Sequence, residues 1–255
     1  MTAAVVTGGG RGLGRGIALA LAGAGFDLVI GCTGRPDAAA AVAAEIAAGG
    51  RRAEVVAGDV ADPDTAKLLL DAASSLGGLG SWVNNAGISV LAPLVDTSAA
   101  DLDRMLDVNV AGVFHGLQAA ARWFLAAGVA GRIVNIASDL GLQAFPNLGA
   151  YAATKFAVVG LTKTAALELG ASGITVNAVC PGTAETDMVM AERSSEVALT
   201  GLSTGEVRTA YLSAIPAGRF CTPDDVGGLV AWLCGPAATY VTGQAICVNG
   251  GSVLH

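Results

Sequence analysis

Three polar side chains in the second half of the chain have the types and spacing that proton transfer needs. Ser138 follows a strand-like run, and Tyr151 and Lys155 are four residues apart in the helical pattern that comes next. Residues four apart share one face of a helix. A phenol has an ordinary pKa near 10, so it becomes a usable base at neutral pH only if its phenolate form is stabilised by about 4 kcal/mol. The charge of one ammonium group at about 4 Å supplies roughly that much. The pattern predicts a tyrosine acid or base beside a serine hydroxyl, although a snorkelling tyrosine with a solvated lysine would also fit.

A glycine-rich turn near the N-terminus, "TGGGRGLG" from Thr7 to Gly14, joins a strand-like run to a helical pattern. Its glycines permit the sharp turn and the close backbone approach that a pyrophosphate at a helix N-terminus requires. The spacing of Gly8, Gly12 and Gly14 departs from Gly-x-Gly-x-x-Gly. Taken alone, the turn indicates a dinucleotide site and leaves a purely structural role open.

The elements that must position these residues follow from the hydrophobic pattern. The strand-like runs lie near 3–7, 27–32, 53–58, 80–84, 132–138, 173–179 and 244–248. The helical stretches lie near 12–25, 37–48, 63–76, 99–127, 150–171 and 223–234. This alternation predicts an α/β fold: a doubly wound, parallel, seven-stranded sheet of the Rossmann type, with strand order 3-2-1-4-5-6-7 and helices on both faces. The segment from about 183 to 221 is expected to be irregular and to form an inserted lid near 186–212.

Composition excludes several classes of function. The 255 residues, 53% of them hydrophobic, suffice for one domain, and no linker divides 1–255. The net charge of −7 disfavours binding to nucleic acids and to anionic membranes. With no basic leader before the first strand-like run and no long uncharged apolar stretch, we expect a cytoplasmic protein without membrane or nucleic-acid partners. The cysteines are expected to be buried free thiols and to bind no metal; they are Cys32, Cys180, Cys221, Cys234 and Cys247.

Together, the motifs resemble those of the short-chain dehydrogenase/reductase family. The resemblance covers essentially the whole chain and rests on eight pieces in the family's order: "TGGGRGLG", "GDV" (58–60), "NNAG" (84–87), "NV" with Asn109, Ser138, "YAATK" (151–155), "CPG" (180–182) and "VNGG" (248–251). It implies an oxidoreductase that passes a hydride between C4 of a nicotinamide and a substrate carbon while Tyr151 exchanges a proton with the substrate oxygen. The implied catalytic set is Asn109, Ser138, Tyr151 and Lys155.

The resemblance also assigns roles within that set. Lys155 is implied to grip the nicotinamide ribose and to make Tyr151 more acidic. Asn109 resembles the family's asparagine at a helix kink, which anchors a water for proton relay to the lysine.

A cofactor site is implied in the same way. The glycine turn would hold the pyrophosphate, the "GDV" and "NNAG" pieces the adenosine, and the residues from Pro181 to Thr186 the nicotinamide end. Ala184 departs from the branched residue that the family often has there. The implied cofactor-binding residues are Gly8, Gly10, Arg11, Gly12, Leu13, Gly14, Thr33, Arg35, Asp59, Val60, Asn85, Ala86, Gly87, Tyr151, Lys155, Pro181, Gly182, Thr183 and Thr186.

The loop after the second strand-like run lacks the acid that would bind the ribose 2′-hydroxyl of NAD(H). Cys32, Thr33, Gly34 and Arg35 occupy that place. Arg11 and Arg35 could instead meet the 2′-phosphate of NADP(H), as in the similar carrier-protein reductases of the family. We therefore expect NADP(H) to be favoured over NAD(H), although both arginines would also suit a solvated surface.

Two differences from those carrier-protein reductases favour a small substrate. Val129, Ala130 and Ser172 stand where the reductases tend to carry the basic surface that an acidic carrier protein needs. The segment 186–212 looks longer than theirs and resembles the lids of acetoin/diacetyl reductases and polyol dehydrogenases. We expect a small vicinal diol, polyol or α-hydroxyketone. The candidate substrate contacts are Ser138, Gln143, Asn147, Tyr151 and Thr183.

Two other functions are compatible with the sequence. The chain could be a 3-oxoacyl-carrier-protein reductase or, in another class, a non-catalytic dinucleotide-binding regulator. The catalytic set argues against the regulator, because a mere binder needs neither the serine nor the asparagine.

The helix near 150–171 is apolar or small on most of its circumference, so we expect one face to meet a partner in a homodimer or homotetramer.

Overall fold

A computed structural model describes residues 2–254; Met1 and His255, the ends of the expected single domain, lie outside the described residues. Its strands form one seven-stranded sheet in the order β3-β2-β1-β4-β5-β6-β7, and each neighbouring pair is parallel. The strands are β1 (Ala3–Thr7), β2 (Asp27–Cys32), β3 (Ala53–Ala57), β4 (Leu79–Asn84), β5 (Arg132–Ile136), β6 (Thr175–Pro181) and β7 (Ala245–Val248). The doubly wound fold and its strand order are confirmed. The order reverses between β1 and β4, where such sheets open a crevice at the carboxyl ends of their strands.

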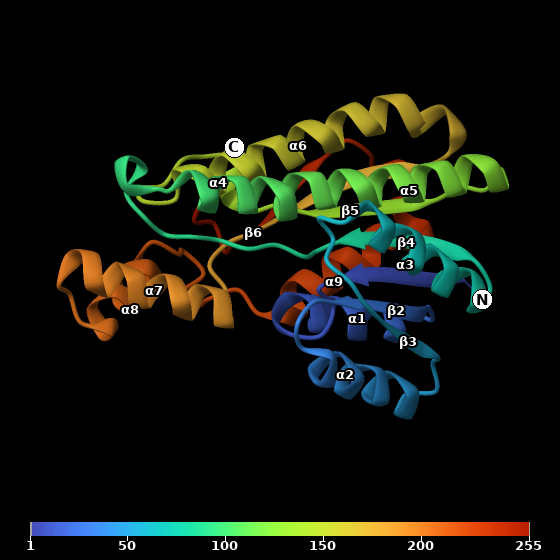
Figure 1. Ribbon diagram of the computed structural model, residues 1–255, viewed down its shortest axis with the longest axis horizontal. Helices are drawn as coiled ribbons and strands as arrows, with labels where there is room; N and C mark the ends of the chain where they lie inside the picture. Colours follow the sequence, from blue (N-terminus) through green and yellow to red (C-terminus); the bar gives the residue numbers. More distant parts are fainter. Residues whose placement is uncertain (1, 255) are drawn as a thin grey trace.

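Helices cover both faces of the sheet (Figure 1). One layer holds α1 (Gly12–Gly23), α2 (Pro36–Ala48) and α9 (Pro223–Cys234). The other holds α3 (Pro63–Ser75), α5 (Gly112–Ala127), with α4 (Ala99–Leu106) leading into it, and α6 (Gly149–Leu169). Short 3₁₀ turns are η1 (Leu94–Asp96), η3 (Asp139–Gly141), η4 (Gly170–Ser172) and η5 (Pro236–Ala238). Among residues 2–254, no helix has the length and apolar character needed to cross a bilayer.

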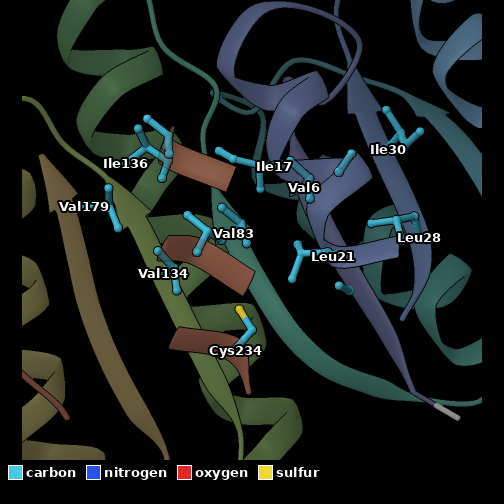
Figure 2. Packing of buried hydrophobic residues seen from close by; sticks show 14 of the residues in the cluster. Val6, Ile17, Leu21, Leu28, Ile30, Val83, Val134, Ile136, Val179 and Cys234 are labelled. Carbon is cyan, nitrogen blue, oxygen red and sulfur yellow. The ribbon is translucent and has the colours of Figure 1, made fainter. Parts of the chain in front are cut away.

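The core lies between the helices and both faces of the sheet. Figure 2 shows Ile17 and Leu21 of α1 packed over Val6, Val83 and Val134 of the central strands. On the opposite face, the fully buried Trp82 and Phe124 anchor the second layer. Because both faces are covered, the central strands are apolar throughout, which is why they were visible in the sequence. Cys32, Cys180 and Cys234 are buried free thiols as expected, whereas Cys221 and Cys247 are only half-buried.

The expected helix near 99–127 is divided by a π-helical turn, η2 (Asp107–Ala111). Asn109 lies in this turn and its side chain is fully buried. Its Nδ2 donates to the carbonyl of Ile88, and its Oδ1 accepts from the amide of Ile88, both at 2.8 Å. A π turn adds one residue without breaking the apolar pattern, so the periodicity could not reveal it. The turn directs Asn109 at the loop that follows β4.

The expectation of an irregular lid is wrong, because the segment folds into two helices, α7 (Asp187–Thr200) and α8 (Thr204–Ser213). In Figure 1 the pair stands apart from the body of the molecule, at the side where the sheet's carboxyl ends lie. The Thr186 hydroxyl caps α7, and Ser203 and Glu206 form a capping box at α8. These caps were readable in the sequence. The inward face of α7 carries charged residues, however, and this weakens its apolar period.

Candidate active site

A cavity of about 540 Å³ opens at the carboxyl ends of the central strands and collects most of the expected site residues. The expected residues that line it are Gly8, Gly10, Arg11, Gly12, Leu13, Gly14, Thr33, Arg35, Asp59, Val60, Asn85, Ala86, Gly87, Ser138, Tyr151, Lys155, Pro181, Gly182 and Thr186. These residues lie at or after the carboxyl ends of six strands, β1 to β6, in turns or at the starts of helices. Asn109 lies buried behind this lining.

The glycine turn forms one end of the cavity. Gly8 and Gly12 have φ values of +64° and +50°, a region that favours glycine. A Cβ on Gly14 would lie 2.1 Å from the carbonyl oxygen of Gly8. Asn85 fixes the turn from the end of β4, because its Nδ2 donates to the carbonyls of Thr7 at 2.9 Å and Gly8 at 3.1 Å. No side chain caps the N-terminus of α1, so its first amides fit the pyrophosphate of a dinucleotide.

Ser138, Tyr151 and Lys155 meet at the other end. Ser138 follows β5, while Tyr151 and Lys155 lie on successive turns at the start of α6. The Ser138 hydroxyl lies close enough to Tyr151 to lower the pKa of the phenol, against the larger effect of burial, which raises it. The buried Lys155 ammonium lies 5.5 Å from the centre of the Tyr151 ring and donates to the carbonyl of Ile136 at 3.0 Å. This is an arrangement that can exchange a proton with a substrate oxygen.

The electrostatics of this end differ from the expectation that Lys155 lowers the pKa of Tyr151. Burial, then the negative charge of Glu192 and to a smaller extent that of Asp139, raise the pKa of the Tyr151 phenol, while Ser138 opposes them. Burial also lowers the pKa of Lys155 to about 8. Burial is therefore the largest influence on the pKa of both side chains.

Asn109 ties the catalytic helix to the loop after β4. Besides its two bonds to Ile88, its Nδ2 donates to Thr154 Oγ1 at 3.1 Å. The Thr154 hydroxyl in turn donates to the carbonyl of Tyr151 at 2.7 Å. This chain of bonds positions the first turn of α6, and the water-anchoring role of Asn109 stays a prediction.

The groups around the adenosine end are paired with partners that the sequence did not suggest. Asp59 Oδ2 lies 2.6 Å from Arg104 Nη2. Burial raises the pKa of Asp59, but the Ala61 amide and the Arg104 guanidinium outweigh it and hold the pKa below its ordinary value. Thr33 donates its hydroxyl to the carbonyl of Gly58.

Three expected substrate contacts lie outside the lining of the cavity. Gln143 is exposed, and Asn147 is half-buried with a φ of +63°. Asparagine tolerates this left-handed conformation, which gives Asn147 a local structural reason to be there. The carbonyl of the half-buried Thr183 accepts from the amide of Cys221 at 2.9 Å. Their contacts with a substrate remain predictions.

Several groups around the site were missed. Asp139 accepts from the Ser138 hydroxyl at 3.1 Å and from the Ser252 hydroxyl at 3.4 Å. Its position directly after Ser138 was a signal available in the sequence. Glu192 and Asp187, on α7, come to the site only through the packing of the lid.

Known proteins resemble this chain over nearly its full length. The family model described as "Enoyl-(Acyl carrier protein) reductase" matches residues 8–253. The L-2,3-butanediol dehydrogenase of Corynebacterium glutamicum is 43% identical over 257 residues, which cover 99% of this chain and 98% of that protein. A 3-oxoacyl-[acyl-carrier-protein] reductase of Staphylococcus aureus is 39% identical, with 98% of each chain covered.

Solved structures agree with these relatives. The crystal structure of acetoin dehydrogenase from Enterobacter cloacae superposes with a TM-score of 0.86 at 36% identity, covering 98% of this chain and 95% of that chain. Relatives of this kind are oxidoreductases rather than non-catalytic binders. The chain therefore belongs to the short-chain dehydrogenase/reductase family, whose members use NAD(H) or NADP(H), and it is an oxidoreductase acting on CH–OH groups.

Proposed function

We propose that this enzyme interconverts a secondary alcohol and its ketone in a small vicinal diol, polyol or α-hydroxyketone, with NADP(H) favoured over NAD(H). The observation that carries the proposal is the meeting of Ser138, Tyr151 and Lys155 at one end of a cavity whose other end is a glycine cradle. This arrangement sets a proton-transfer group at the end of a cofactor-sized cleft.

The protein's own groups supply orientation and proton transfer. A nicotinamide cofactor held by the glycine turn, Lys155 and the Pro181–Gly182 end would supply the hydride acceptor or donor. Ser138 donates to Asp139 and accepts from the Leu140 amide, both at 3.1 Å, so its oxygen keeps one lone pair that could accept from a substrate hydroxyl. Tyr151 takes up or releases the proton of that hydroxyl. The bonds from Asn109 through Thr154 hold the turn that carries Tyr151 in place.

The lid supports a compact substrate. Met188 and Val189 of α7 line the cavity together with Tyr151, so the helix forms part of the cavity wall. A lid that closes over a site excludes water and limits the size of what enters. The names of the butanediol and acetoin dehydrogenase relatives support the same class of substrate. A 3-oxoacyl thioester is the second candidate, because the Staphylococcus aureus reductase is nearly as similar.

The cofactor preference rests on the end of β2. Cys32 and Thr33 offer no carboxylate there, and Arg11 and Arg35 line the same end of the cavity. Two guanidinium groups suit the 2′-phosphate of NADP(H). We expect a higher kcat/KM with NADP(H), and the reverse order would contradict the assignment.

Self-association is also part of the proposal. The outer face of α6 carries a stripe of exposed small and apolar side chains that includes Ala153, Phe156, Gly160 and Leu167. Such a face favours a homodimer or homotetramer.

A direct comparison of substrates tests the proposal. Purified protein is assayed by nicotinamide absorbance with acetoin, butane-2,3-diol and a short sugar alcohol, and with an acetoacetyl thioester, each with NAD(H) and NADP(H). We expect the small substrates to give the higher kcat/KM. A higher value for the thioester would replace the first candidate with the second.

A further inference from the structure

We infer that Glu192, on the lid helix α7, is a substrate-recognition residue that accepts a hydrogen bond from the second, non-reacting hydroxyl of the substrate. The inference deepens the proposed function and rests on it. It assigns the preference for a diol or hydroxyketone over a simple alcohol or ketone to one side chain of the lid.

Helix geometry places Glu192 on the face of α7 that covers the site. Met188 and Val189 line the cavity that also contains Ser138 and Tyr151. Glu192 is four residues after Met188 and three after Val189, so it lies one turn further on the same face. Glu192 is half-buried, whereas Ala191, Ser194 and Ser195 beside it are exposed.

The surroundings of Glu192 are polar and close to the reacting hydroxyl. The Ser89 hydroxyl, in the loop after β4, lies close enough to Glu192 to lower the pKa of its carboxyl, although burial raises that pKa more. The Ser89 Oγ is shielded from solvent and has no hydrogen-bond partner among residues 2–254. Glu192 is near enough to Tyr151 for its charge to raise the pKa of the phenol. The charge of Glu192 therefore acts where a substrate oxygen would meet Tyr151.

The other charged groups on this face of α7 are engaged within the lid. Arg193 Nη1 lies 3.6 Å from Glu185 Oε1, and its guanidinium stacks 4.6 Å from the ring centre of Phe220. Burial raises the pKa of the Tyr211 phenol of α8, and the nearby Glu196 raises it further. These contacts join α7 to α8 and to the segment before α9. The charge of Glu192, by contrast, acts on the catalytic tyrosine.

Asp139 is the other carboxylate whose charge acts on Tyr151, and it already accepts hydrogen bonds from two side chains of the protein. It accepts from Ser138 at 3.1 Å and from Ser252 at 3.4 Å. Removing a carboxylate from water lowers stability unless a partner compensates for it. A substrate hydroxyl would supply such a partner to Glu192, and this explains a charged residue on the covered face of a lid.

The test compares substrates that differ by one hydroxyl. Butane-2,3-diol and butan-2-ol are oxidised by the wild-type enzyme and by Glu192→Leu, Glu192→Gln and Glu196→Gln. Glu196→Gln is the matched control, because Glu196 lies one turn further on the same face. Circular dichroism and thermal unfolding check that each variant is folded.

We expect Glu192→Leu to raise KM for the diol about tenfold or more, as the loss of a hydrogen bond to a charged group does, with butan-2-ol changed less than about threefold. Glu192→Gln keeps an acceptor oxygen and should lose less, and Glu196→Gln should change neither substrate. Equal losses on both substrates, or an unchanged diol KM in Glu192→Gln and Glu192→Leu, would overturn the role of Glu192 while leaving the proposed function intact. Absence of turnover of every small alcohol by the wild-type enzyme would overturn both.

Discussion

Asp187 Oδ2 lies 2.8 Å from Arg11 Nη1 and 3.6 Å from Arg35 Nη1, so one carboxylate of the lid joins both arginines of the adenosine end. All three side chains are about 60% exposed, and ion pairs of this kind add little to stability. Their consequence concerns cofactor choice. The Asp187 carboxylate pairs with the two arginine side chains that would bind the 2′-phosphate of NADP(H).

Replacing Asp187 by Asn is expected to strengthen NADP(H) binding a few-fold and to leave NAD(H) binding nearly unchanged, because the arginines lose a competing anion. Fluorescence titration with NADPH and NADH measures both Kd values. Asp71→Asn removes the similarly exposed pair with Lys67, outside the lining of the cavity, and is the control. A weaker NADPH affinity in Asp187→Asn would instead mean that Asp187 holds the arginines in place for the phosphate.

Tyr151→Phe removes the proton-transfer hydroxyl and little else. Turnover should fall by about 10²–10⁴-fold, while the affinity for the cofactor is retained. Ser138→Ala should lose less, because it removes a positioning group. The measurements are steady-state rates and cofactor titration, with Tyr240→Phe, at a fully exposed tyrosine, as control. More than about a tenth of the wild-type rate in Tyr151→Phe would show that another group transfers the proton.

Gly14→Ala tests the role of the glycine turn as the cradle that would hold the cofactor's pyrophosphate. The added Cβ would meet the Gly8 carbonyl at 2.1 Å, so the turn must move. We expect cofactor affinity to fall at least about tenfold and the free energy of unfolding to fall by about 1–3 kcal/mol, as for other overpacked sites. Gly23→Ala, in the same helix with nothing within 4 Å, should change stability by less than about 1 kcal/mol. Similar effects of the two substitutions would refute the cradle.

We expect Asp27 to make the free energy of unfolding depend on pH in the acid range. Burial raises the pKa of this carboxyl, but hydrogen bonds from the Arg52 amide at 2.9 Å and guanidinium at 2.7 Å outweigh burial, so the pKa lies below its ordinary value. The stabilisation is present above the ordinary pKa and is lost as pH falls through the lowered one. Asp27→Asn should lower the free energy of unfolding by about 2 kcal/mol at neutral pH, and less at acid pH. Urea titrations at several pH values measure this, and a loss independent of pH would contradict it.

Phe156→Glu tests the proposed assembly. Phe156 is 48% exposed on the outer stripe of α6. We expect the wild-type protein to be a dimer or tetramer by light scattering at micromolar concentration, and the variant to be smaller. Leu68→Glu, at an exposed leucine of α3, is the control. A monomeric wild-type protein would rule out this interface.

The sequence by itself determined the sheet and the reacting set. Buried strands and covering helices have different periods, so seven strands and their order could be predicted from local pattern. Ser138, Tyr151 and Lys155 are close in sequence around one strand end and one helix start, so their meeting needed little long-range information. The glycine turn is equally local, because its φ values are a property of its own residues.

Only the tertiary structure decided what surrounds that set. Arg11 and Asp187 are 176 residues apart, and their contact depends on how the lid packs against the glycine turn. Burial raises the pKa of the Tyr151 phenol, and the same packing of the lid adds the charge of Glu192, which raises it further, against the expectation from Lys155 alone. The π turn at Asn109 was hidden because one extra residue does not disturb an apolar pattern. Local periodicity fixes elements, whereas the charges facing a site depend on contacts between elements, which no pattern within one element encodes.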